Sequence, residues 1–311
     1  MRVAVTGAAG FIGSSLCDQL LDEGHHVVGV DVFTDDYNRD VKESNLARAR
    51  GYETFCLVEE DLLEADLDQL LDGIDVVFHL AGCPGVRASW GSHFETYLRG
   101  NVLATQRLLE AACRVPVDRF VYSSSSSVYG APDHFPTSES DLPQPRSPYG
   151  VSKLAGEHLC SAYHRNFAVP TVALRYFTVF GPRQRPAMAI QRLILAAKSG
   201  LEFELLGDGS QVRDFTFVTD VVRANLLAAT SPSAVGEVVN IGGGSAVSMV
   251  EVIRMVEHLT DRQLAINVSS VAKGDVPRTQ ADTARAGVVL GWVPTVDFET
   301  GLGHQIASVI D

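Results

Sequence analysis

The fold of this chain is decided by one stretch near its N-terminus, Arg2-Val3-Ala4-Val5-Thr6-Gly7-Ala8-Ala9-Gly10-Phe11-Ile12-Gly13. Residues 2–6 read as a buried β-strand, and residues from Phe11 onward have the periodicity of an amphipathic helix. The glycines between them allow a tight turn and let the backbone approach a pyrophosphate, whose charge meets free N–H groups at the helix N-terminus. The sequence therefore predicts a strand, a glycine turn and a helix that bind a phosphate group.

An acid at the end of the second predicted strand extends this pattern. Residues 26–30 are again apolar, and Asp31 follows them, 18 residues after Gly13. A carboxylate there accepts hydrogen bonds from the 2′- and 3′-hydroxyls of a ribose and repels a 2′-phosphate. The glycine spacing is G-x-x-G-x-x-G, which an ordinary strand-to-helix turn also fits. Together with Asp31, however, it favours a dinucleotide site for NAD rather than NADP.

A second stretch, Tyr149-Gly150-Val151-Ser152-Lys153, holds the parts of a proton-transfer device and follows a run of five serines, residues 123–127. If residues 149–153 are helical, the phenol and the ammonium project from one face, since four residues make just over one turn. A neighbouring cation lowers the pKa of a phenol from its usual value of about 10 toward neutrality. The pattern predicts a base that deprotonates an alcohol, although a packed tyrosine beside a solvated lysine has the same spacing.

Composition excludes several classes of partner. The chain has 311 residues, 46% of them hydrophobic, which is enough for a large core and two lobes. A net charge of −13 argues against nucleic acid or an anionic membrane as the main partner. The five cysteines are scattered and lack C-x-x-C spacing, so we expect reduced thiols and no metal site. With no apolar run long enough for a bilayer and no signal peptide, we expect a cytoplasmic protein.

Strand and helix patterns alternate through the first half, which favours an α/β fold with a parallel sheet covered on both faces, a doubly wound arrangement of the Rossmann type. The expected strands lie near residues 2–6, 26–31, 53–57, 75–80, 118–123 and 170–175. The expected helices lie near residues 11–23, 66–72, 93–113, 148–166 and 188–198. The pattern loosens from Phe177, where a smaller second lobe begins. A helix at 220–229 and a strand at 238–241 return to the first lobe.

With these motifs in order along nearly the whole chain, the sequence resembles the extended short-chain dehydrogenases/reductases that act on nucleotide sugars. Within that family it is most similar to UDP-glucuronate 4-epimerases in residues 84–90 and 176–186. The family resemblance is carried by residues 6–13, 31, 61–62, 79–82, 101–102, 123–130, 149–153, 213–215, 240–242 and 274–278. It implies an NAD-binding Rossmann domain of residues 1–176 with 219–242. It also implies a nucleotide-sugar-binding domain of residues 177–218 with 243–311.

The resemblance also implies roles for single residues. Ser125, Tyr149 and Lys153 would be catalytic. Asp61 has a plain alternative as a helix cap, and His79, at the end of an apolar strand, reads as a core histidine rather than an acid or base. The residues implied to bind NAD are Gly7, Gly10, Phe11, Ile12, Asp31, Asp61, Leu62, Leu80, Ala81, Asn101, Tyr149 and Lys153.

For the substrate, arginines would meet the diphosphate by charge-assisted hydrogen bonds and Asp275 would hold the nucleoside ribose. Hydroxyls would hold a carboxylate on the sugar, with Arg185 restraining the pocket. Alternatively, the serines line a generic hydroxymethyl pocket and some of the arginines are solvated. The implied substrate residues are Arg87, Ser125, Ser126, Ser127, Tyr149, Thr178, Arg185, Arg192, Arg213, Asp275 and Arg278.

The implied reaction is NAD-dependent epimerisation at C4 of UDP-glucuronate to UDP-galacturonate through a 4-keto sugar, without decarboxylation. Three alternatives remain open: a UDP-glucose/galactose-type 4-epimerase, a decarboxylating UDP-xylose synthase, and an inactive NAD-sensing protein on the same fold. A 4,6-dehydratase needs an Asp-Glu pair before Val128-Tyr129-Gly130, where this chain has Ser126-Ser127. The family also implies a homodimer through the helices near residues 93–113 and 148–166.

Overall fold

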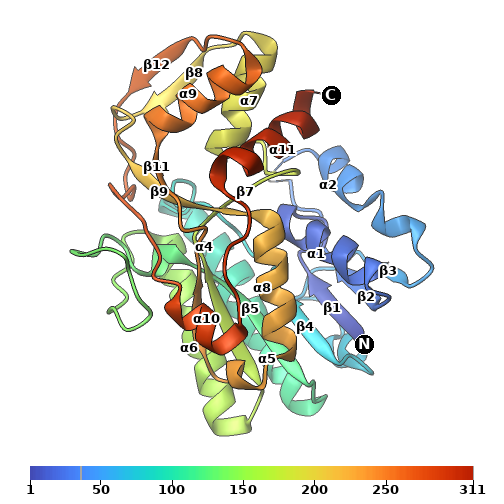
Figure 1. Ribbon diagram of the computed structural model, residues 1–311. Helices are drawn as coiled ribbons and strands as arrows, with labels where there is room; N and C mark the ends of the chain where they lie inside the picture. Colours follow the sequence, from blue (N-terminus) through green and yellow to red (C-terminus); the bar gives the residue numbers. More distant parts are fainter. Residues whose placement is uncertain (36, 311) are drawn as a thin grey trace.

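The computed structural model describes residues 1–35 and 37–310. Within them, the chain folds around a seven-stranded parallel sheet with helices on both faces (Figure 1). The strand order is β10-β6-β5-β4-β1-β2-β3. The predicted α/β fold with a doubly wound parallel sheet is confirmed.

The strands of this sheet lie close to the predicted ranges. The expected strand at 238–241 is β10, which pairs in parallel with β6 at the edge of the sheet. The bounds are β1 Arg2–Thr6, β2 His26–Val30, β3 Phe55–Val58, β4 Val76–His79, β5 Arg119–Ser125, β6 Thr171–Tyr176 and β10 Val238–Ile241.

Alternation along the strands divides the apolar side chains between two cores. Val3 and Val5 of β1 pack in one core with Leu16 and Leu20, whereas Ala4 packs in the other with Leu108. The helices around the sheet are α1 Phe11–Asp22, α2 Arg39–Leu46, α3 Leu67–Leu71, α4 Phe94–Tyr97, α5 Ala104–Arg114, α6 Pro148–Phe167 and α8 Val218–Thr230, with short 3₁₀ turns at Ala49–Gly51, Gly91–His93, Ser126–Val128 and Pro232–Ala234.

The single helix expected over residues 93–113 is wrong in one respect. The chain is helical there, but a π-helical segment, η3 Leu98–Leu103, separates α4 from α5. This widened turn contains Asn101, whose side chain is buried. Such π-helical turns often mark functional sites because they change the direction in which a side chain points.

Of the remaining elements, β8, β12, α7 and α9 lie together in the upper part of the molecule in Figure 1, whereas α10 lies in the lower part, near α6 and α8. β7 pairs in parallel with β9, and β9 pairs antiparallel with β11. Among these elements, the sequence predicted only the helix near residues 188–198. These elements are β7 Thr178–Phe180, α7 Ala189–Ser199, β8 Phe203–Leu206, β9 Val212–Phe217, β11 Ala246–Ser248, α9 Met249–Thr260, β12 Ile266–Ser269, α10 Ala284–Leu290 and α11 Phe298–Ile310.

Among the described helices, none combines the length and the apolar character needed to cross a membrane.

Candidate functional site

A cavity of about 590 Å³ lies at the carboxyl ends of β1, β2, β4 and β5, where parallel sheets usually bind ligands. The start of α6 and β7 and the segment after β7 complete its lining. Many residues implied to bind NAD are brought together here: Gly7, Gly10, Phe11, Ile12, Asp31, Asp61, Leu62, Leu80, Ala81, Tyr149 and Lys153.

The glycine turn packs so closely against neighbouring backbone that side chains have no room there. Gly7 has a φ of +71°, and a Cβ on it would lie 2.8 Å from the backbone nitrogen of Ala81. A Cβ on Gly13 would lie 2.1 Å from the carbonyl oxygen of Gly7. No side chain of the described chain caps Gly10 at the start of α1, so backbone N–H groups of the first turn face the cavity.

Asp31 lies at the same end of the sheet and is held by the backbone. Its carboxylate accepts hydrogen bonds from the N–H groups of Ala9 at 3.0 Å and Phe33 at 2.8 Å. The ammonium of Lys42, which also lines the cavity, lies 3.6 Å from the same carboxylate and donates to Thr34 at 3.1 Å. Lys42 was not among the predicted site residues, because α2, which carries it, was not predicted from the sequence.

Two other residues implied to contact NAD have structural partners. Asp61 accepts a hydrogen bond from the N–H of Leu63 at 2.9 Å, as a turn-forming carboxylate does, while still lining the cavity. Asn101 lies behind the cavity wall: its amide donates to the carbonyl of Cys83 and to Ser152, both at 2.9 Å, and accepts from the N–H of Cys83 at 2.6 Å. It therefore fixes the loop after β4 against α6.

The three residues implied to be catalytic reach the cavity from two regular elements. Ser125 is the last residue of β5, and Tyr149 and Lys153 lie one turn apart near the start of α6. Ser147 caps α6 by accepting a hydrogen bond from the N–H of Gly150 at 3.1 Å. A cap and a proline at the first helical position fix where α6 begins, and so where Tyr149 points.

A buried ion pair holds α6 against the sheet. Glu157 accepts two hydrogen bonds from Arg175 of β6, at 2.9 and 2.7 Å, and a third from Ser124. Arg175 also donates to the hydroxyl of Tyr129 at 2.8 Å. Since Ser124 precedes Ser125, this network fixes the end of β5 and the helix that carries Tyr149 relative to each other.

The pKa shifts of Tyr149 and Lys153 differ from those expected from the sequence. Burial raises the pKa of Tyr149, while a hydrogen bond with Ser125 and the charge of Arg185 lower it. Burial lowers the pKa of Lys153 to about 8, against the opposing charge of Glu157. The prediction that Lys153 brings the phenol toward neutrality is therefore wrong for the protein alone: burial dominates, and the lowering charge comes from Arg185.

His79 lies at the end of β4 and is buried, as predicted for a core histidine. Its Nε2 lies 2.9 Å from Thr105 Oγ1, which donates to the carbonyl of Asn101, so Nε2 carries the hydrogen. Its Nδ1 lies 2.8 Å from Thr6 Oγ1. Burial lowers its pKa to about 3, so His79 is neutral and does not act as an acid or base.

The residues implied to bind substrate divide into three groups. Ser126, Ser127, Thr178 and Arg185 line the cavity together with the trio. Arg87 and Arg213 lie outside this lining but converge on Asp275, at 3.3 and 3.4 Å.

Two further arginines are engaged elsewhere. Arg192 on α7 lies 3.9 Å from Glu204 and over the ring of Phe203. Arg278 donates to Gln280 at 2.7 Å and lies over the ring of Phe135. Neither side chain lines the cavity or joins the Arg87–Asp275–Arg213 cluster among the described contacts.

Known proteins resemble this chain over its whole length. It is 44% identical over 308 residues to a protein of Bacillus subtilis named an uncharacterized UDP-glucose epimerase, covering 99% of this chain and 97% of the relative. It is 34% identical over 308 residues to a UDP-glucuronate 4-epimerase of Thermodesulfobacterium geofontis, covering 97% and 94% of the two chains.

A solved structure has the same fold over nearly the whole chain. The UDP-glucuronic acid 4-epimerase of Bacillus cereus, crystallised with UDP-glucuronic acid and NAD, superposes with a TM-score of 0.97 at 43% identity, covering 99% of each chain. The model of the NAD dependent epimerase/dehydratase family matches residues 3–242. The resemblance drawn from the motifs is confirmed, and the chain belongs to the NAD-dependent epimerase/dehydratase family.

Proposed function

We propose that this enzyme uses NAD to epimerise C4 of UDP-glucuronate, giving UDP-galacturonate without loss of carbon dioxide. One observation carries the proposal: Ser125, Tyr149 and Lys153 share a cavity with the glycine turn, Asp31 and the hydroxyl and guanidinium groups across from them. The Bacillus cereus epimerase with the same substrate class supports it at 43% identity.

The protein's own residues account for the proton transfer. Tyr149 as a phenolate takes the proton of the sugar 4-hydroxyl, and Ser125 orients the same oxygen. When bound, NAD supplies the acceptor that takes the C4 hydride and returns it, and its oxidised ring carries a positive charge that favours the phenolate. The charge of Arg185 also favours the phenolate, because it lowers the pKa of Tyr149. Because the product is a C4 epimer, the keto sugar must turn before the hydride returns.

The site must hold the sugar carboxylate so that the 4-keto intermediate does not lose carbon dioxide. A 4-keto uronic acid is a β-keto acid, which loses carbon dioxide when its bond to the carboxylate aligns with the carbonyl π system. Ser126 and Ser127 lie in the turn after β5, Thr178 begins β7, and Arg185 comes from the loop beyond. These groups converge from separate elements and would hold the carboxylate out of that alignment.

The Arg87–Asp275–Arg213 cluster is the natural place for the nucleotide end of the substrate. Burial lowers the pKa of Arg213, Asp275 opposes this shift, and the charge of Arg87 adds a smaller lowering. Two guanidinium groups near one carboxylate leave positive charge for a diphosphate in a chain whose net charge is −13. Asp275 would then accept from the nucleoside ribose.

The deciding experiment offers purified enzyme UDP-glucuronate and UDP-glucose separately and identifies the products by NMR. We expect UDP-galacturonate from the first, formed faster than UDP-galactose from the second. A clear preference for UDP-glucose, or UDP-xylose as the main product, would overturn the carboxylate assignment.

The cofactor has its own test. NAD should remain bound on purification, because the reaction regenerates it in each cycle and Asp31 disfavours a 2′-phosphate. Denaturing the protein and identifying the released nucleotide checks this, and NADP as the main species would contradict the role of Asp31.

Three further expectations belong to the same proposal. The NAD-binding domain comprises residues 1–176 with 219–242, which the pairing of β10 with β6 supports. The sugar-binding domain comprises residues 177–218 with 243–311. The enzyme acts in the cytoplasm as a homodimer.

A further inference from the structure

Arg185 reaches the cavity from a segment, residues 181–188, that is fastened on both sides. On one side, buried Gln184 donates to the carbonyl of Val179 at 3.0 Å and accepts from Gln305 of α11 at 2.9 Å. On the other side, Arg183 turns toward α1, the helix that follows the glycine turn. The residues flanking Arg185 therefore connect it to two distant parts of the chain.

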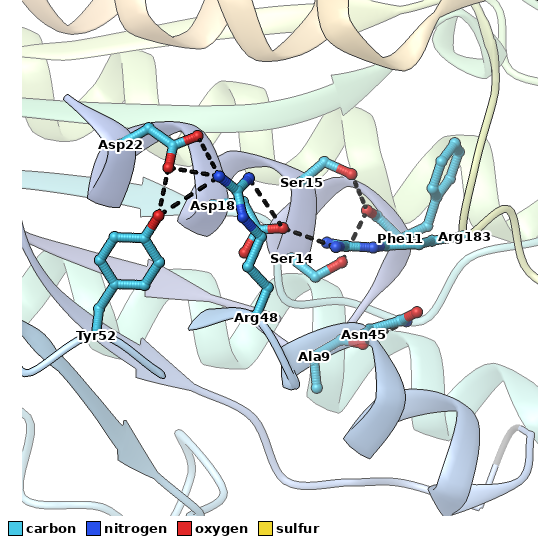
Figure 2. Close-up of polar contacts among 10 residues, drawn as sticks. All are labelled: Ala9, Phe11, Ser14, Ser15, Asp18, Asp22, Asn45, Arg48, Tyr52 and Arg183. Carbon is cyan, nitrogen blue, oxygen red and sulfur yellow. Dashed lines mark hydrogen bonds and ion pairs between the residues drawn. The ribbon is translucent and has the colours of Figure 1, made fainter. Parts of the chain in front are cut away.

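The contact of Arg183 with α1 is an ion pair between a half-buried guanidinium and a buried carboxylate. Its Nη2 lies 2.7 Å from Oδ2 of Asp18, a residue with a side chain only 9% exposed (Figure 2). The backbone of Arg183 has a φ of +67°, in the left-handed region that residues other than glycine rarely adopt. Strain of this kind persists only where surrounding contacts fix the chain. The ion pair and the Gln184 contacts supply that restraint.

The pair is poorly arranged for stability alone. Oδ1 of Asp18 and Nη1 of Arg183 are buried and have no hydrogen-bond partner within the part of the chain that the structure describes. A buried ion pair with unmet groups contributes little net stability, because desolvation offsets the attraction. Arg48, the other cation near Asp18, is 4.0 Å away and hydrogen-bonds Asp22 at 2.7 and 2.8 Å (Figure 2). What the pair does provide is a fixed distance between α1 and residue 183.

We propose that Asp18 and Arg183 are positioning residues that hold Arg185 over the sugar carboxylate and thereby suppress decarboxylation. The inference rests on the proposed function. If residue 183 moves, Arg185 moves with it, and the carboxylate is free to align with the 4-keto group. The C5–carboxylate bond then breaks, its electron pair forms an enolate, and carbon dioxide leaves. Protonation at C5 and return of the hydride to C4 would give a UDP-pentose.

The test replaces Asp18 with Asn, which keeps the shape and removes the charge. Asp22→Asn is the matched control, since it makes the same change one turn further along α1, where the carboxylate contacts Arg48 and Tyr52 instead. With UDP-glucuronate as substrate, Asp18→Asn should raise the ratio of UDP-pentose to UDP-galacturonate about tenfold, the scale expected when a remote change misplaces a group by a fraction of an ångström. Asp22→Asn should give the wild-type ratio.

A second variant and a double-mutant cycle separate positioning from general loss of structure. Arg183→Gln should shift the product ratio as Asp18→Asn does. In an Arg185→Ala background, Asp18→Asn should change the ratio no further, because both changes act through the same guanidinium. An additional increase in that background, or equal ratios for the Asp18 and Asp22 variants, would overturn the inference.

Hydrogen exchange gives a readout that needs no substrate. The amides of residues 181–188 should exchange about tenfold faster in Asp18→Asn than in Asp22→Asn, since local opening follows lost local contacts. If wild type makes no UDP-galacturonate, the proposed function fails while exchange still decides the positioning role. Unchanged exchange in Asp18→Asn would refute that role whatever the substrate.

Discussion

The cavity has two walls that differ in construction. One wall consists of the end of β5 and the start of α6, which are regular elements joined by the hydrogen bond from Ser124 to Glu157. The other consists of the three-residue strand β7 and residues 181–188, which are held by side chains from α1 and α11. The first wall carries the groups for proton transfer and the second carries Thr178 and Arg185. In the proposed function, proton transfer takes place at the wall built from regular elements, and the sugar carboxylate is held mainly by the wall built from short segments.

The largest expected effect tests the first wall. Tyr149→Phe removes the base and keeps the ring, so turnover should fall by at least about 100-fold, the usual scale for lost acid–base catalysis. Folding and NAD content should survive, as thermal unfolding and the nucleotide released on denaturation would show. Lys153→Met should behave alike but also retain less NAD. Near wild-type turnover in Tyr149→Phe would contradict the role of Tyr149 as the catalytic base.

Acid should destabilise the sheet behind the cavity through His79, the last residue of β4. Its pKa falls from 6.5 to about 3 on burial, so below pH 6.5 the unfolded chain binds a proton that the native state does not. The stability that this group contributes is complete above pH 6.5 and is lost as the pH falls toward 3. Between pH 7 and pH 5 the loss should be about 2 kcal/mol in the free energy of unfolding. Denaturant unfolding of wild type and His79→Asn at both pH values measures it, and parallel pH dependences would contradict it.

Two arginines outside both walls, Arg213 and Arg278, test where the diphosphate binds. Arg213→Ala should raise the KM for UDP-glucuronate about tenfold, the scale of one charge-assisted hydrogen bond. Arg278→Ala should change it less, because its guanidinium already contacts Gln280 and Phe135. Initial rates over a range of substrate concentrations give both constants. A larger increase in KM for Arg278→Ala than for Arg213→Ala would contradict the proposal that the diphosphate binds at the Arg87–Asp275–Arg213 cluster.

The smallest expected effect concerns one hydroxyl. Thr178→Ala should leave oxidation at C4 intact and raise the share of UDP-pentose about threefold, as loss of one neutral hydrogen bond permits. Thr178→Ser keeps the hydroxyl and should retain the wild-type share. Anion-exchange separation of the products compares the two variants. Identical shares of UDP-pentose in Thr178→Ala and Thr178→Ser would contradict a role of the Thr178 hydroxyl in holding the carboxylate.

Local pattern was enough to predict the glycine turn and the part of the first wall that α6 forms. β1, the glycine turn and α6 each show their periodicity, turn residues or capping signals within a few positions, so the sheet and the spacing of Tyr149 and Lys153 could be predicted from the sequence. The pKa of Tyr149 could not, because it depends on burial and on Arg185, which is 36 residues away in the sequence.

The second wall and the ribose end depend on contacts that no local pattern reveals. α2 is largely polar, with no apolar stripe to mark it, and so Lys42 beside Asp31 went unseen. β8 and β12 are four-residue strands separated by about sixty residues, and the π-helical turn at Asn101 interrupts what reads as a continuous helix. Short strands and widened turns are stabilised by their neighbours rather than by their own sequence.

The late position of β10 has a consequence for how the protein is made. Chains emerge from the ribosome N-terminus first, and their domains fold as units. When β6 has emerged, more than sixty residues must still follow before β10 covers its edge. During that interval the nascent chain presents an unpaired strand edge, which is a template for pairing with a neighbouring chain. Slow translation through residues 177–237 should therefore lower the yield of this enzyme more than equal slowing before residue 170.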